Sequence, residues 1–385
     1  MNMQITDTIR YIGVDDTDLD LFEGQYIVPE GVSYNSYIID DEQPCIMDTV
    51  DERKSEEWLA KIDIVPTYLV MLHCEPDHSG NAAHLLAQFP GMTLVCSAKA
   101  LQFFTQLFPG MDLDGRVKIV KEGDELCLGK HTLHFIAAPM VHWPEVMMAY
   151  ESTDKVLFAA DGFGKFGALC NETDDWACEA RRYYFNICGK YGAQVQSVLK
   201  KAANLDIRHI CPLHGPVLSD NLGYYVGLYD TWSSYRPETQ GVFIAHCSLH
   251  GNTSQAAELL AEELRALGVK VALNDLTRDD YAEGIEDAFR YPVMVLCSPT
   301  YDGGIMPVMA NFIHLLAAKT YQKRTVALVE NGTWAPQAGK LMRAELEKMK
   351  EVEVLEPVVS LRSSVSAENK AAIKSLAQVL SEKIK

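Results

Sequence analysis

Four histidines and three carboxylates in this chain follow short apolar segments, in positions where they could hold metal ions together. The stretch TYLVMLHCEPDHSG, residues 67–80, ends an apolar run in His73, Glu75, Asp77 and His78. The apolar runs FIAAPMV, VLFAA and HICPL are followed by the other three, which are His142, Asp161 and His214. Strand ends on one edge of a sheet converge in space, so we expect these side chains to form one site. Seven ligands are too many for one tetrahedral zinc and suit two metals that share a bridging carboxylate.

The chemistry of this set favours iron. Three carboxylates with neutral imidazoles tolerate the charge of two trivalent ions as well as two divalent ones, and this suits a metal that changes oxidation state. The remaining histidines are expected outside the site, because His84 lies in a helical segment and His131, His134 and His209 lie in strand-like ones. Cys74 lies between ligands but is not expected to bind metal.

Length, charge and cysteine usage limit the function classes. The 385 residues suggest two domains, and a net charge of −19 opposes nonspecific nucleic-acid binding. None of the ten cysteines is spaced C-x-x-C, which leaves a zinc ribbon, an iron–sulfur cluster and a thioredoxin motif without support. No apolar segment reaches the roughly 20 residues of a membrane span, and the N-terminus lacks signal-peptide features. We therefore expect a cytoplasmic protein that binds neither membrane nor nucleic acid.

A polar, turn-rich segment, YDTWSSYRPETQG, precedes a new strand and predicts a domain boundary at residue 237. The predicted domains are 1–237 and 238–385. Regular alternation follows the boundary: strands are predicted at 241–247, 269–276, 292–300, 324–331 and 352–359, and helices at 254–268, 281–290, 306–320, 336–350 and 367–384. This pattern predicts a doubly wound, five-stranded parallel sheet.

Three loops of this second domain point to one ligand. The first opens a helix with hydroxyls and backbone N–H groups that suit a phosphate, and all three follow strands at the sheet edge where ligands bind. The chain lacks the G-x-x-x-x-G-K-[ST] and G-x-G-x-x-G patterns, which makes a nucleoside triphosphate or a dinucleotide less favoured. An aromatic side chain in the third loop could stack on a flat ring. The candidate cofactor-binding residues are Ser248, His250, Gly251, Asn252, Thr253, Pro299, Thr300, Tyr301, Asp302, Gly303, Asn331, Gly332, Thr333 and Trp334.

The motifs HCEPDH, HWPEVM, ADGFG and PLHG resemble those of the metallo-β-lactamase fold. Glu75 stands where hydrolases of that fold usually carry a histidine, and this substitution is similar to the flavodiiron proteins, also called A-type flavoproteins. The resemblance covers roughly residues 5 to 380. It implies an N-terminal metallo-β-lactamase-like αββα sandwich followed by a C-terminal flavodoxin-like domain.

The same resemblance implies the cofactors and their ligands. Two Fe ions are implied, one held by His73, Glu75 and His142, the other by Asp77, His78 and His214, with Asp161 as the bridge. FMN is implied by loops similar to S-x-x-G-N-T, S-P-T-Y-x-G and G-x-x-G-W. Tyr184 matches a tyrosine often found near the iron pocket, either as a hydrogen-bond donor to a bound intermediate or as a buried structural residue.

The implied activity is oxidoreductase: reduction of dioxygen to water, of nitric oxide to nitrous oxide, or of both. No rubredoxin module follows Lys385, so the electron donor is expected to be a separate rubredoxin or similar small protein. The resemblance also implies a homodimer or a homotetramer, because the flavin of one chain then serves the irons of another.

Some residues depart from the family pattern. Glu23 stands where some relatives carry a histidine near the irons, and His246 and His250 occupy phosphate-loop positions where hydroxyl, aromatic or small residues are commoner. The third flavin loop begins with Asn331 instead of the usual Gly-Ser pair. Two alternatives stay open: a zinc-dependent hydrolase with a flavodoxin-like appendage, and an electron-transfer module with a vestigial metal site. The preference between dioxygen and nitric oxide stays open as well.

Overall fold

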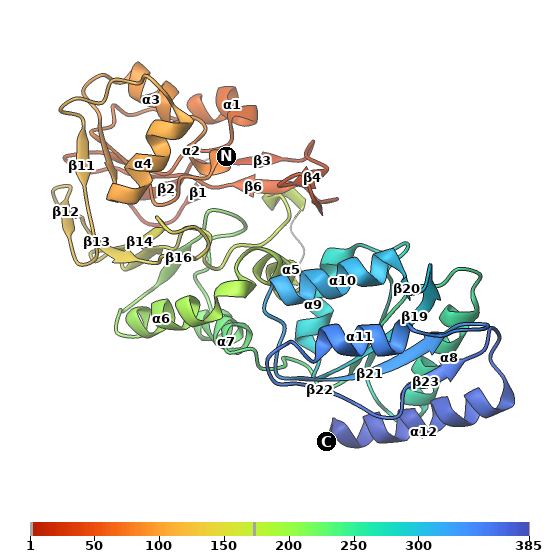
Figure 1. The fold of residues 1–385 in the computed structure, drawn as a ribbon. Helices are drawn as coiled ribbons and strands as arrows, with labels where there is room; N and C mark the ends of the chain where they lie inside the picture. Colours follow the sequence, from red (N-terminus) through yellow and green to blue (C-terminus); the bar gives the residue numbers. More distant parts are fainter. Residues whose placement is uncertain (1–2, 172–174, 385) are drawn as a thin grey trace. The chain divides into compact units, whose positions relative to one another are not determined.

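The chain packs as two compact units (Figure 1), and the computed structural model describes residues 3–171 and 175–384. The first unit comprises Met1–Tyr184 with Tyr191–Asp230, and the second comprises Phe185–Lys190 with Thr231–Lys385. The assignment of 1–237 to metal binding and 238–385 to FMN binding stays a prediction. Within the described ranges, none of the helices has both the length and the apolar character needed to cross a bilayer.

The first unit contains two large sheets. The larger has the strand order β1-β2-β7-β8-β9-β10-β11, with bounds Met3–Gln4, Ile9–Tyr11, Tyr37–Ile39, Cys45–Met47, Tyr68–Val70, Thr93–Cys96 and Val117–Ile119. The other has the order β12-β13-β14-β15-β16, with bounds Glu125–Cys127, Thr132–Ala137, Met147–Glu151, Val156–Phe158 and His209–Cys211. Both sheets are mixed: β8 to β11 run parallel, and β15 is parallel to β16. The parallel strands β9, β15 and β16 precede six of the predicted metal ligands, and the antiparallel strand β13 precedes the seventh, His142.

Helices cover the sheets of the first unit on two sides, with α3 and α4 on one and α6 and α7 on the other (Figure 1). The helices up to residue 233 are η1 Glu52–Lys54, α1 Ser55–Leu59, α2 Pro76–Ser79, α3 Ala82–Gln88, α4 Ala98–Leu107, η2 Leu169–Asn171, α5 Trp176–Ile187, η3 Gly189–Tyr191, α6 Gly192–Ala202 and α7 Leu222–Ser233. Of these, α5, η3 and α7 each include a few residues assigned to the second unit. Two small hairpin-like pairs complete the unit, β3 (Val14–Asp16) with β6 (Val32–Tyr34) and β4 (Leu21–Phe22) with β5 (Tyr26–Ile27). The predicted αββα sandwich is confirmed.

The second unit is a doubly wound sheet of order β18-β17-β19-β21-β22 in which each of these neighbouring pairs is parallel. The strands are β17 Val242–His246, β18 Val271–Asp275, β19 Val293–Tyr301, β20 Gly304–Ile305, β21 Arg324–Asn331, β22 Val352–Val354 and β23 Val359–Leu361. The helices are α8 Asn252–Ala266, α9 Tyr281–Arg290, α10 Pro307–Ala318, α11 Ala338–Leu346 and α12 Ala367–Lys383. Counted along the chain the order is 2-1-3-4-5, the order of flavodoxin-like sheets.

Two details of this sheet differ from the prediction. The fifth predicted strand is divided into β22 and β23, which both pair with β21, because Pro357 between them has no backbone N–H to give to the ladder. The short strand β20 folds back antiparallel onto the end of β19, pairing Thr300 with Ile305. It was not predicted, since two residues carry no readable periodicity.

The core on one face of this sheet explains the regular alternation. In α8, Ala256, Leu260 and Leu264 recur every four residues and are fully buried against strand residues such as Val242 and Val295. Helix α12 joins the same cluster through Ile373, Leu376, Ala377 and Leu380. Spacing of three and four residues places these side chains on one face of each helix. The packed core that they form holds the strands in place, so the loops at the edge of the sheet start from a rigid support.

Candidate functional site

The seven predicted metal ligands come from four loops of the first unit and converge on one place. His73 and Glu75 lie in the loop after β9, and Asp77 and His78 lie on the short helix α2 that follows it. The others occupy the loop between β13 and β14, the loop after β15 and the loop after β16; they are His142, Asp161 and His214. All seven side chains fall into two groups whose ligand atoms lie within 4.8 Å of one another in each group.

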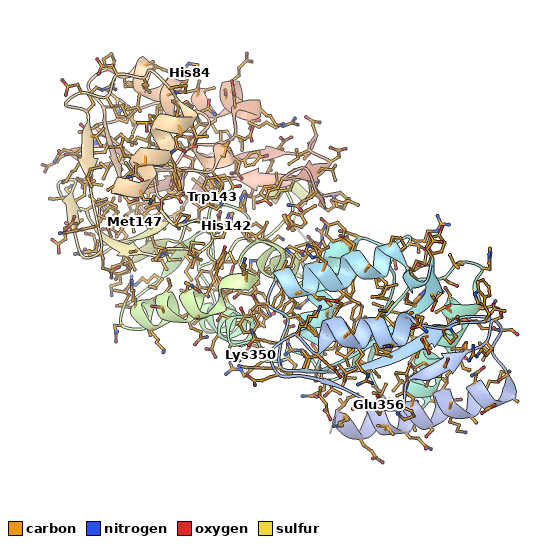
Figure 2. The ribbon with its side chains drawn as sticks, in the orientation of Figure 1. His84, His142, Trp143, Met147, Lys350 and Glu356 are labelled. Carbon is orange, nitrogen blue, oxygen red and sulfur yellow. The ribbon has the colours of Figure 1, made fainter. Side chains whose placement is uncertain are left out.

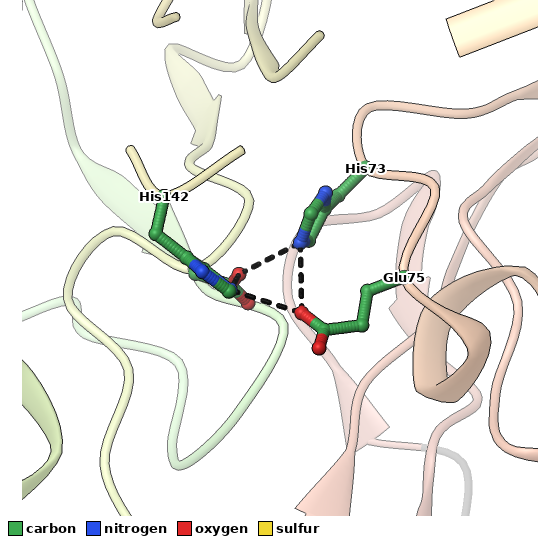
Figure 3. A group of neighbouring side chains, drawn as sticks. His73, Glu75 and His142 are labelled. Carbon is green, nitrogen blue, oxygen red and sulfur yellow. Dashed lines mark hydrogen bonds and ion pairs between the residues drawn. The ribbon is translucent and has the colours of Figure 1, made fainter. Parts of the chain in front are cut away.

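The first group is His73, Glu75, His142 and one oxygen of Asp161 (Figure 3). His73 Nε2 lies 3.2 Å from Glu75 Oε2 and 3.2 Å from Asp161 Oδ2. His142 Nε2 lies 2.9 Å from the same Glu75 oxygen and 3.2 Å from Asp161 Oδ2. Two imidazole nitrogens and two carboxylate oxygens therefore face one point.

The second group is Asp77, His78 and His214. Asp77 Oδ2 lies 3.3 Å from His78 Nε2 and 3.3 Å from His214 Nε2. The other oxygen of Asp161, Oδ1, lies 3.2 Å from His78 Nε2 and 3.9 Å from His214 Nε2. Asp161 therefore turns one oxygen to each group, which is the position of a bridging carboxylate.

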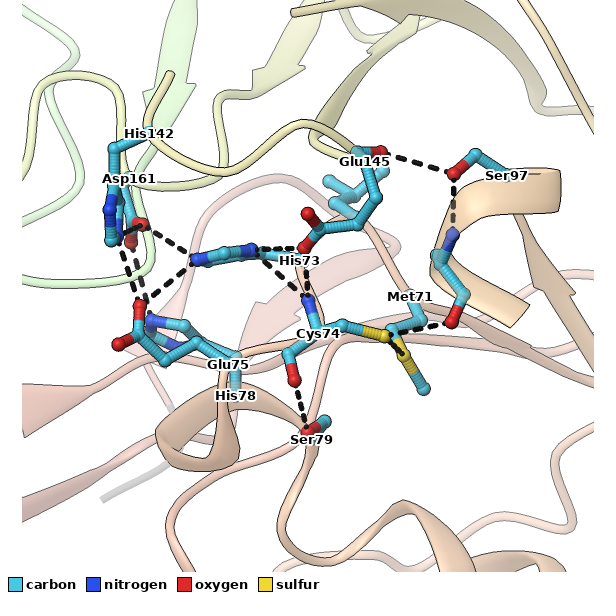
Figure 4. A network of polar contacts seen from close by, with 12 residues as sticks. Met71, His73, Cys74, Glu75, His78, Ser79, Ser97, His142, Glu145 and Asp161 are labelled. Carbon is cyan, nitrogen blue, oxygen red and sulfur yellow. Dashed lines mark hydrogen bonds and ion pairs between the residues drawn. The ribbon is translucent and has the colours of Figure 1, made fainter. Parts of the chain in front are cut away.

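Contacts behind the ligands fix the orientation of their rings (Figure 4). His73 Nδ1 donates to Glu145 Oε1 at 2.7 Å, and the backbone N–H of Cys74 donates to the same oxygen at 3.0 Å. His214 Nδ1 donates to the backbone carbonyl of Ser33 at 2.7 Å. Because each of these two rings gives its Nδ1 proton away from the centre, its Nε2 is left to bind a metal.

Charges within the groups set the pKa values of the ligands. Burial alone would lower the pKa of His73, but the charge of Asp161 and the hydrogen bonds with Glu145 and Glu75 hold it well above its usual value. Burial would raise the pKa of Glu75, but its hydrogen bonds from His142 and His73 lower that pKa to about 2. Burial would lower the pKa of His142, but the partners Asp161 and Glu75 raise it to about 9. Metal binding at such a site displaces protons from the imidazoles.

Unsatisfied buried atoms test whether metal ions fit these residues. In the described part of the chain, six ligand atoms have no hydrogen-bond partner although they are buried: Asp77 Oδ1, His78 Nδ1, His78 Nε2, Asp161 Oδ1, Asp161 Oδ2 and His214 Nε2. Orphaned buried polar groups cost about 1–3 kcal/mol each, and native proteins keep few of them. Cations held between these nitrogens and oxygens would remove most of that cost, so the donor set fits two metal ions.

Residues excluded by the sequence lie outside the two groups. His84 is exposed on α3, at the edge of its unit and away from His142 (Figure 2). His131, His134 and His209 contact Glu151, Glu125 and Ser219 respectively. The thiol of Cys74 points to Met71 Sδ at 3.1 Å and to the Ala100 carbonyl at 3.2 Å (Figure 4).

Tyr184 is the tyrosine expected near the irons, and the residue before it, Tyr183, has a ring contact with a predicted metal ligand. Tyr184 is fully buried, and its ring packs edge-on against Tyr229 with centroids 5.2 Å apart. The ring of Tyr183 lies 5.6 Å from that of His214. Neighbouring positions on a helix face different directions, so of the two rings it is Tyr183 whose contact with a predicted ligand is observed. A role for Tyr184 stays a prediction.

The predicted flavin loops enclose a cavity of about 530 Å³ in the second unit. Its walls come from the loops after β17, β19 and β21, at the carboxyl edge of the parallel strands. Of the fourteen predicted residues, thirteen line it: Ser248, His250, Asn252, Thr253, Pro299, Thr300, Tyr301, Asp302, Gly303, Asn331, Gly332, Thr333 and Trp334. Gly251 lies beside them at the start of α8 with a φ of +87°, a backbone angle that side chains disfavour. The volume falls within the ~300–1,000 Å³ usual for cofactor sites.

Hydrogen bonds connect these loops to one another. Ser248 Oγ accepts from the backbone N–H of Gly251 at 3.0 Å and of Thr253 at 3.3 Å, which shapes the turn that opens α8. Asn331 Nδ2 donates to Thr253 Oγ1 at 3.4 Å and to the Ser363 carbonyl at 2.9 Å. Asn331, which departs from the family pattern, therefore connects the start of α8 and the segment after β23 by hydrogen bonds.

Comparisons with known proteins find relatives that match nearly the whole chain. A family model described as ODP family beta lactamase matches residues 32–215, which include all seven metal candidates. A protein named nitric oxide reductase from Moorella thermoacetica is 29% identical, covering 92% of this chain and 91% of its own. The crystal structure of the flavodiiron protein from Giardia intestinalis covers 100% of this chain and 97% of its own at 27% identity, with a TM-score of 0.94. Over its whole length the chain is similar to flavodiiron proteins.

A second solved structure extends this agreement. It is named rubredoxin oxygen:oxidoreductase, from Desulfovibrio gigas, and it matches 100% of this chain and 98% of its own. The identity is 25% and the TM-score 0.93. Fold similarity therefore spans both units of the chain and not the first unit alone.

Sequence reasoning missed several residues of the two candidate sites. Glu145 stands three positions after His142 in the quoted motif HWPEVM, and an acidic residue inside an apolar segment was the available signal. Leu249, Ala335, Gln337 and Ser363 also line the flavin cavity. Ser363 follows β23, so the rule that ligands bind past the carboxyl ends of parallel strands could have found it.

Proposed function

We propose that this chain is a flavodiiron oxidoreductase that reduces dioxygen to water, nitric oxide to nitrous oxide, or both, at a pair of iron ions. Electrons would reach the irons through FMN from a separate rubredoxin-type donor. The observation that carries the proposal is Asp161, whose two buried oxygens face two separate His–carboxylate groups. A single-metal hydrolase has no need of the second group, and a vestigial site has no reason to keep both.

The residues divide the work of holding the metals. His73, Glu75 and His142 would hold one iron, Asp77, His78 and His214 the other, and Asp161 would bridge them. Two irons held in this way supply redox electrons and open coordination positions for a small gas molecule. Glu145 and the Ser33 carbonyl keep the rings of His73 and His214 oriented, and burial of the ligands keeps water away from most of the centre.

The second unit would supply the flavin. Its cavity lies at the carboxyl edge of a 2-1-3-4-5 sheet, and the N-terminus of α8 offers backbone N–H groups and a positive dipole end for the FMN phosphate. Tyr301 and Trp334 offer aromatic faces for the isoalloxazine ring. A flavin carrier beside a metal hydrolase would have no purpose, so this cavity favours redox chemistry over the zinc alternative.

Names of related proteins support the choice of substrates and donor. One relative is named nitric oxide reductase and one solved structure is named rubredoxin oxygen:oxidoreductase, so both gases and a rubredoxin donor occur among proteins similar to this one. The homodimer or homotetramer, the cytoplasmic location and the hydrogen-bonding role of Tyr184 remain predictions of this proposal.

Metal and flavin analysis followed by anaerobic kinetics tests the proposal. Protein purified and reconstituted without oxygen is expected to hold two irons and one FMN per chain, and to oxidise reduced rubredoxin when either gas is added. Steady-state rates with each gas separately would establish the preference. Zinc without flavin would favour the hydrolase, and flavin without metal would favour the electron-transfer module; either result contradicts the proposal.

A further inference from the structure

A second cluster of metal-capable side chains lies in the first unit, apart from the seven already described. It consists of His131, Glu151 and Asp154, which offer ligand atoms that all lie within 4.8 Å of one another. His131 and Glu151 are 2% and 0% exposed, and Asp154 is half-buried. One imidazole with two carboxylates is a set of ligands that divalent transition metals accept.

Two hairpin turns of the sheet β12-β13-β14-β15-β16 bring these residues together. His131 directly precedes β13, Glu151 ends β14, and Asp154 lies in the turn between β14 and β15. The predicted iron ligands His142 and Asp161 follow the opposite ends of β13 and β15. Because the six residues of β13 extend over roughly 20 Å, the cluster belongs to neither iron group.

The contact between His131 and Glu151 has the same form as contacts within the iron groups. His131 Nδ1 lies 3.1 Å from Glu151 Oε1, yet among the described residues this buried nitrogen has no hydrogen-bond partner. His78 Nε2 shows the same combination, since it lies 3.2 Å from Asp161 Oδ1 and is also without a hydrogen bond. A nitrogen and a carboxylate oxygen that are close but not aligned for a hydrogen bond can both be satisfied by a cation that they share.

The other nitrogen of His131 orients its ring. Nε2 lies 2.9 Å from Thr8 Oγ1, and the Thr8 hydroxyl donates to Asp154 Oδ2 at 3.2 Å. Thr6 Oγ1 donates to the same Asp154 oxygen at 2.5 Å. A proton on Nε2 that is given to Thr8 leaves Nδ1 as a lone pair that can bind metal. The N-terminal segment before β2 thus contacts both hairpin turns.

Backbone groups hold the Glu151 carboxylate toward the cluster. Its Oε1 accepts from the N–H of Thr153 and its Oε2 from the N–H of Asp154, both at 2.7 Å. Each carboxylate oxygen has a further lone pair, so these hydrogen bonds leave capacity for a cation. The charges also fit, because two carboxylates and a neutral imidazole are balanced by one divalent ion.

A hollow of about 510 Å³ gives water access to the cluster. Its wall includes Thr8, His131 and Asp154. The cations Lys130 and Arg208 lie on the same wall and are exposed, so water and salt screen their repulsion of a bound ion. Water from this hollow can complete the coordination of an ion that has three protein ligands.

We propose that His131, Glu151 and Asp154 bind one divalent metal ion of the zinc class, separate from the pair of metal positions in the candidate metal centre. The ion has a structural role. It joins the β12–β13 turn to the β14–β15 turn and, through the hydrogen bonds of Thr8, holds the N-terminal segment against them. This site does not depend on the reaction at the other centre.

Metal counting tests the site in protein loaded with iron and FMN. After equilibration with zinc and removal of the excess, the wild type should hold one zinc per chain beyond the metal of the candidate metal centre. His131→Gln should hold one ion fewer than the wild type. His134→Gln is the matched control and should keep the zinc, because His134 also contacts a glutamate, Glu125 at 3.1 Å, but belongs to none of the ligand clusters.

A second variant, Asp154→Asn, keeps the test valid if His131→Gln folds poorly. The side chain is half-buried, and an amide oxygen still accepts from Thr6 and Thr8. D154N should lower the zinc affinity about 100-fold in a chelator competition. X-ray absorption of the wild-type zinc should show one imidazole nitrogen and oxygen ligands at about 2.0–2.2 Å. Zinc should slow amide hydrogen exchange at residues 6–8 in the wild type and not in D154N.

Equal metal counts in the wild type and H131Q would overturn the site. So would a wild type without the additional zinc, or a loss of zinc in H134Q as large as in H131Q. If zinc also replaced iron in the candidate metal centre, the difference of one ion between the wild type and H131Q would still support the site. A wild type that reduces neither gas would contradict the proposed function and leave this metal count unchanged.

Discussion

The candidate metal centre and the candidate flavin cavity differ in how deeply their residues are buried and in how many contacts each site depends on. The metal centre gathers charged side chains in a buried place, where none of the seven ligands is more than 15% exposed. The flavin cavity is made of loops at a sheet edge, and its aromatic residues are open to solvent, with Trp334 88% and Tyr301 44% exposed. The first site depends on a few exact partners, and the second spreads its contacts over four loops.

This difference determines how each site should respond to mutation. Removing one member of a buried charge cluster leaves its partners uncompensated, which costs several kcal/mol. Removing one side chain from an exposed cavity costs only its own contact, because backbone groups and the other loops remain. A single mutation among the metal ligands should therefore remove most of the metal binding, whereas a single mutation in the flavin cavity should weaken FMN binding only partly.

The largest effect is expected for Asp161→Asn. The amide keeps the shape of the side chain but loses the negative charge and one of the two oxygens that face the ligand groups. Loss of the bridge should reduce the iron content to one or none per chain and lower gas reduction by about 1,000-fold, equivalent to about 4 kcal/mol of lost stabilisation. Metal analysis, flavin absorbance and steady-state rates would measure this, with FMN content expected to stay unchanged.

A matched control is Asp112→Asn, an exposed aspartate whose Oδ1 accepts from the backbone N–H of Asp114 at 3.0 Å and can do so as an amide. It should keep both irons and full activity. Two irons and wild-type rates in D161N would contradict the bridging role, and loss of FMN in D161N would contradict the independence of the two sites.

An intermediate effect is expected for Glu145→Gln, behind the ligand His73. The carboxylate accepts from His73 Nδ1 at 2.7 Å and is fully buried on its side-chain atoms. An amide can still accept one hydrogen bond but no longer stabilises the positive charge that a bound metal places on the ring. Such partners typically contribute 10–100-fold to metal affinity, so E145Q should lose about that much in a chelator competition.

Glu125→Gln is the control for this change. Glu125 pairs with His134 at 3.1 Å, a similar glutamate–histidine contact that is partly exposed and outside the ligand groups. E125Q should bind metal as the wild type does. Equal affinities in E145Q and E125Q would show that the contact behind His73 has no influence on the metal.

Much of the fold was predictable from the sequence because its local signals agree with its global packing. The second unit alternates buried strands with amphipathic helices, and α9 begins and ends at the predicted residues Tyr281 and Arg290. The five-stranded doubly wound sheet followed from the alternation and the size of the domain, and the structure gives its order as 2-1-3-4-5. Strand β20 and the division between β22 and β23 were missed because they depend on pairing across the sheet, which periodicity does not report.

The metal groups were predictable because ligand chemistry restricts residue types, and the flavin loops because parallel strands expose one edge. What the sequence could not provide were contacts between distant residues. Glu145 binds a ring 72 positions earlier in the chain, and Ser363 meets Asn331 across 32 positions. The contact of the Tyr183 ring with His214 depends on the rotation of α5 about its axis, since one residue turns a side chain by about 100°.

The smallest effect is expected for Trp334→Ala. Its side chain is 88% exposed on the rim of the flavin cavity, so it contributes one aromatic face and little burial of its own. Loss of this face should weaken FMN binding by about 1 kcal/mol, equivalent to about five-fold in Kd, at the low end of the range for stacking on an aromatic side chain. Fluorescence titration of flavin-free protein with FMN would measure it, and Trp334→Phe should recover most of the loss.

A much larger loss would contradict the contrast between the two sites. If W334A failed to bind FMN, the flavin cavity would depend on a single anchor, as the metal centre depends on Asp161, and the remaining loops would contribute only shape. Iron content provides the second check, because W334A should keep both irons if the metal centre is organised by its own unit alone. Loss of iron in W334A would mean that the exposed rim of one unit supports the buried charges of the other.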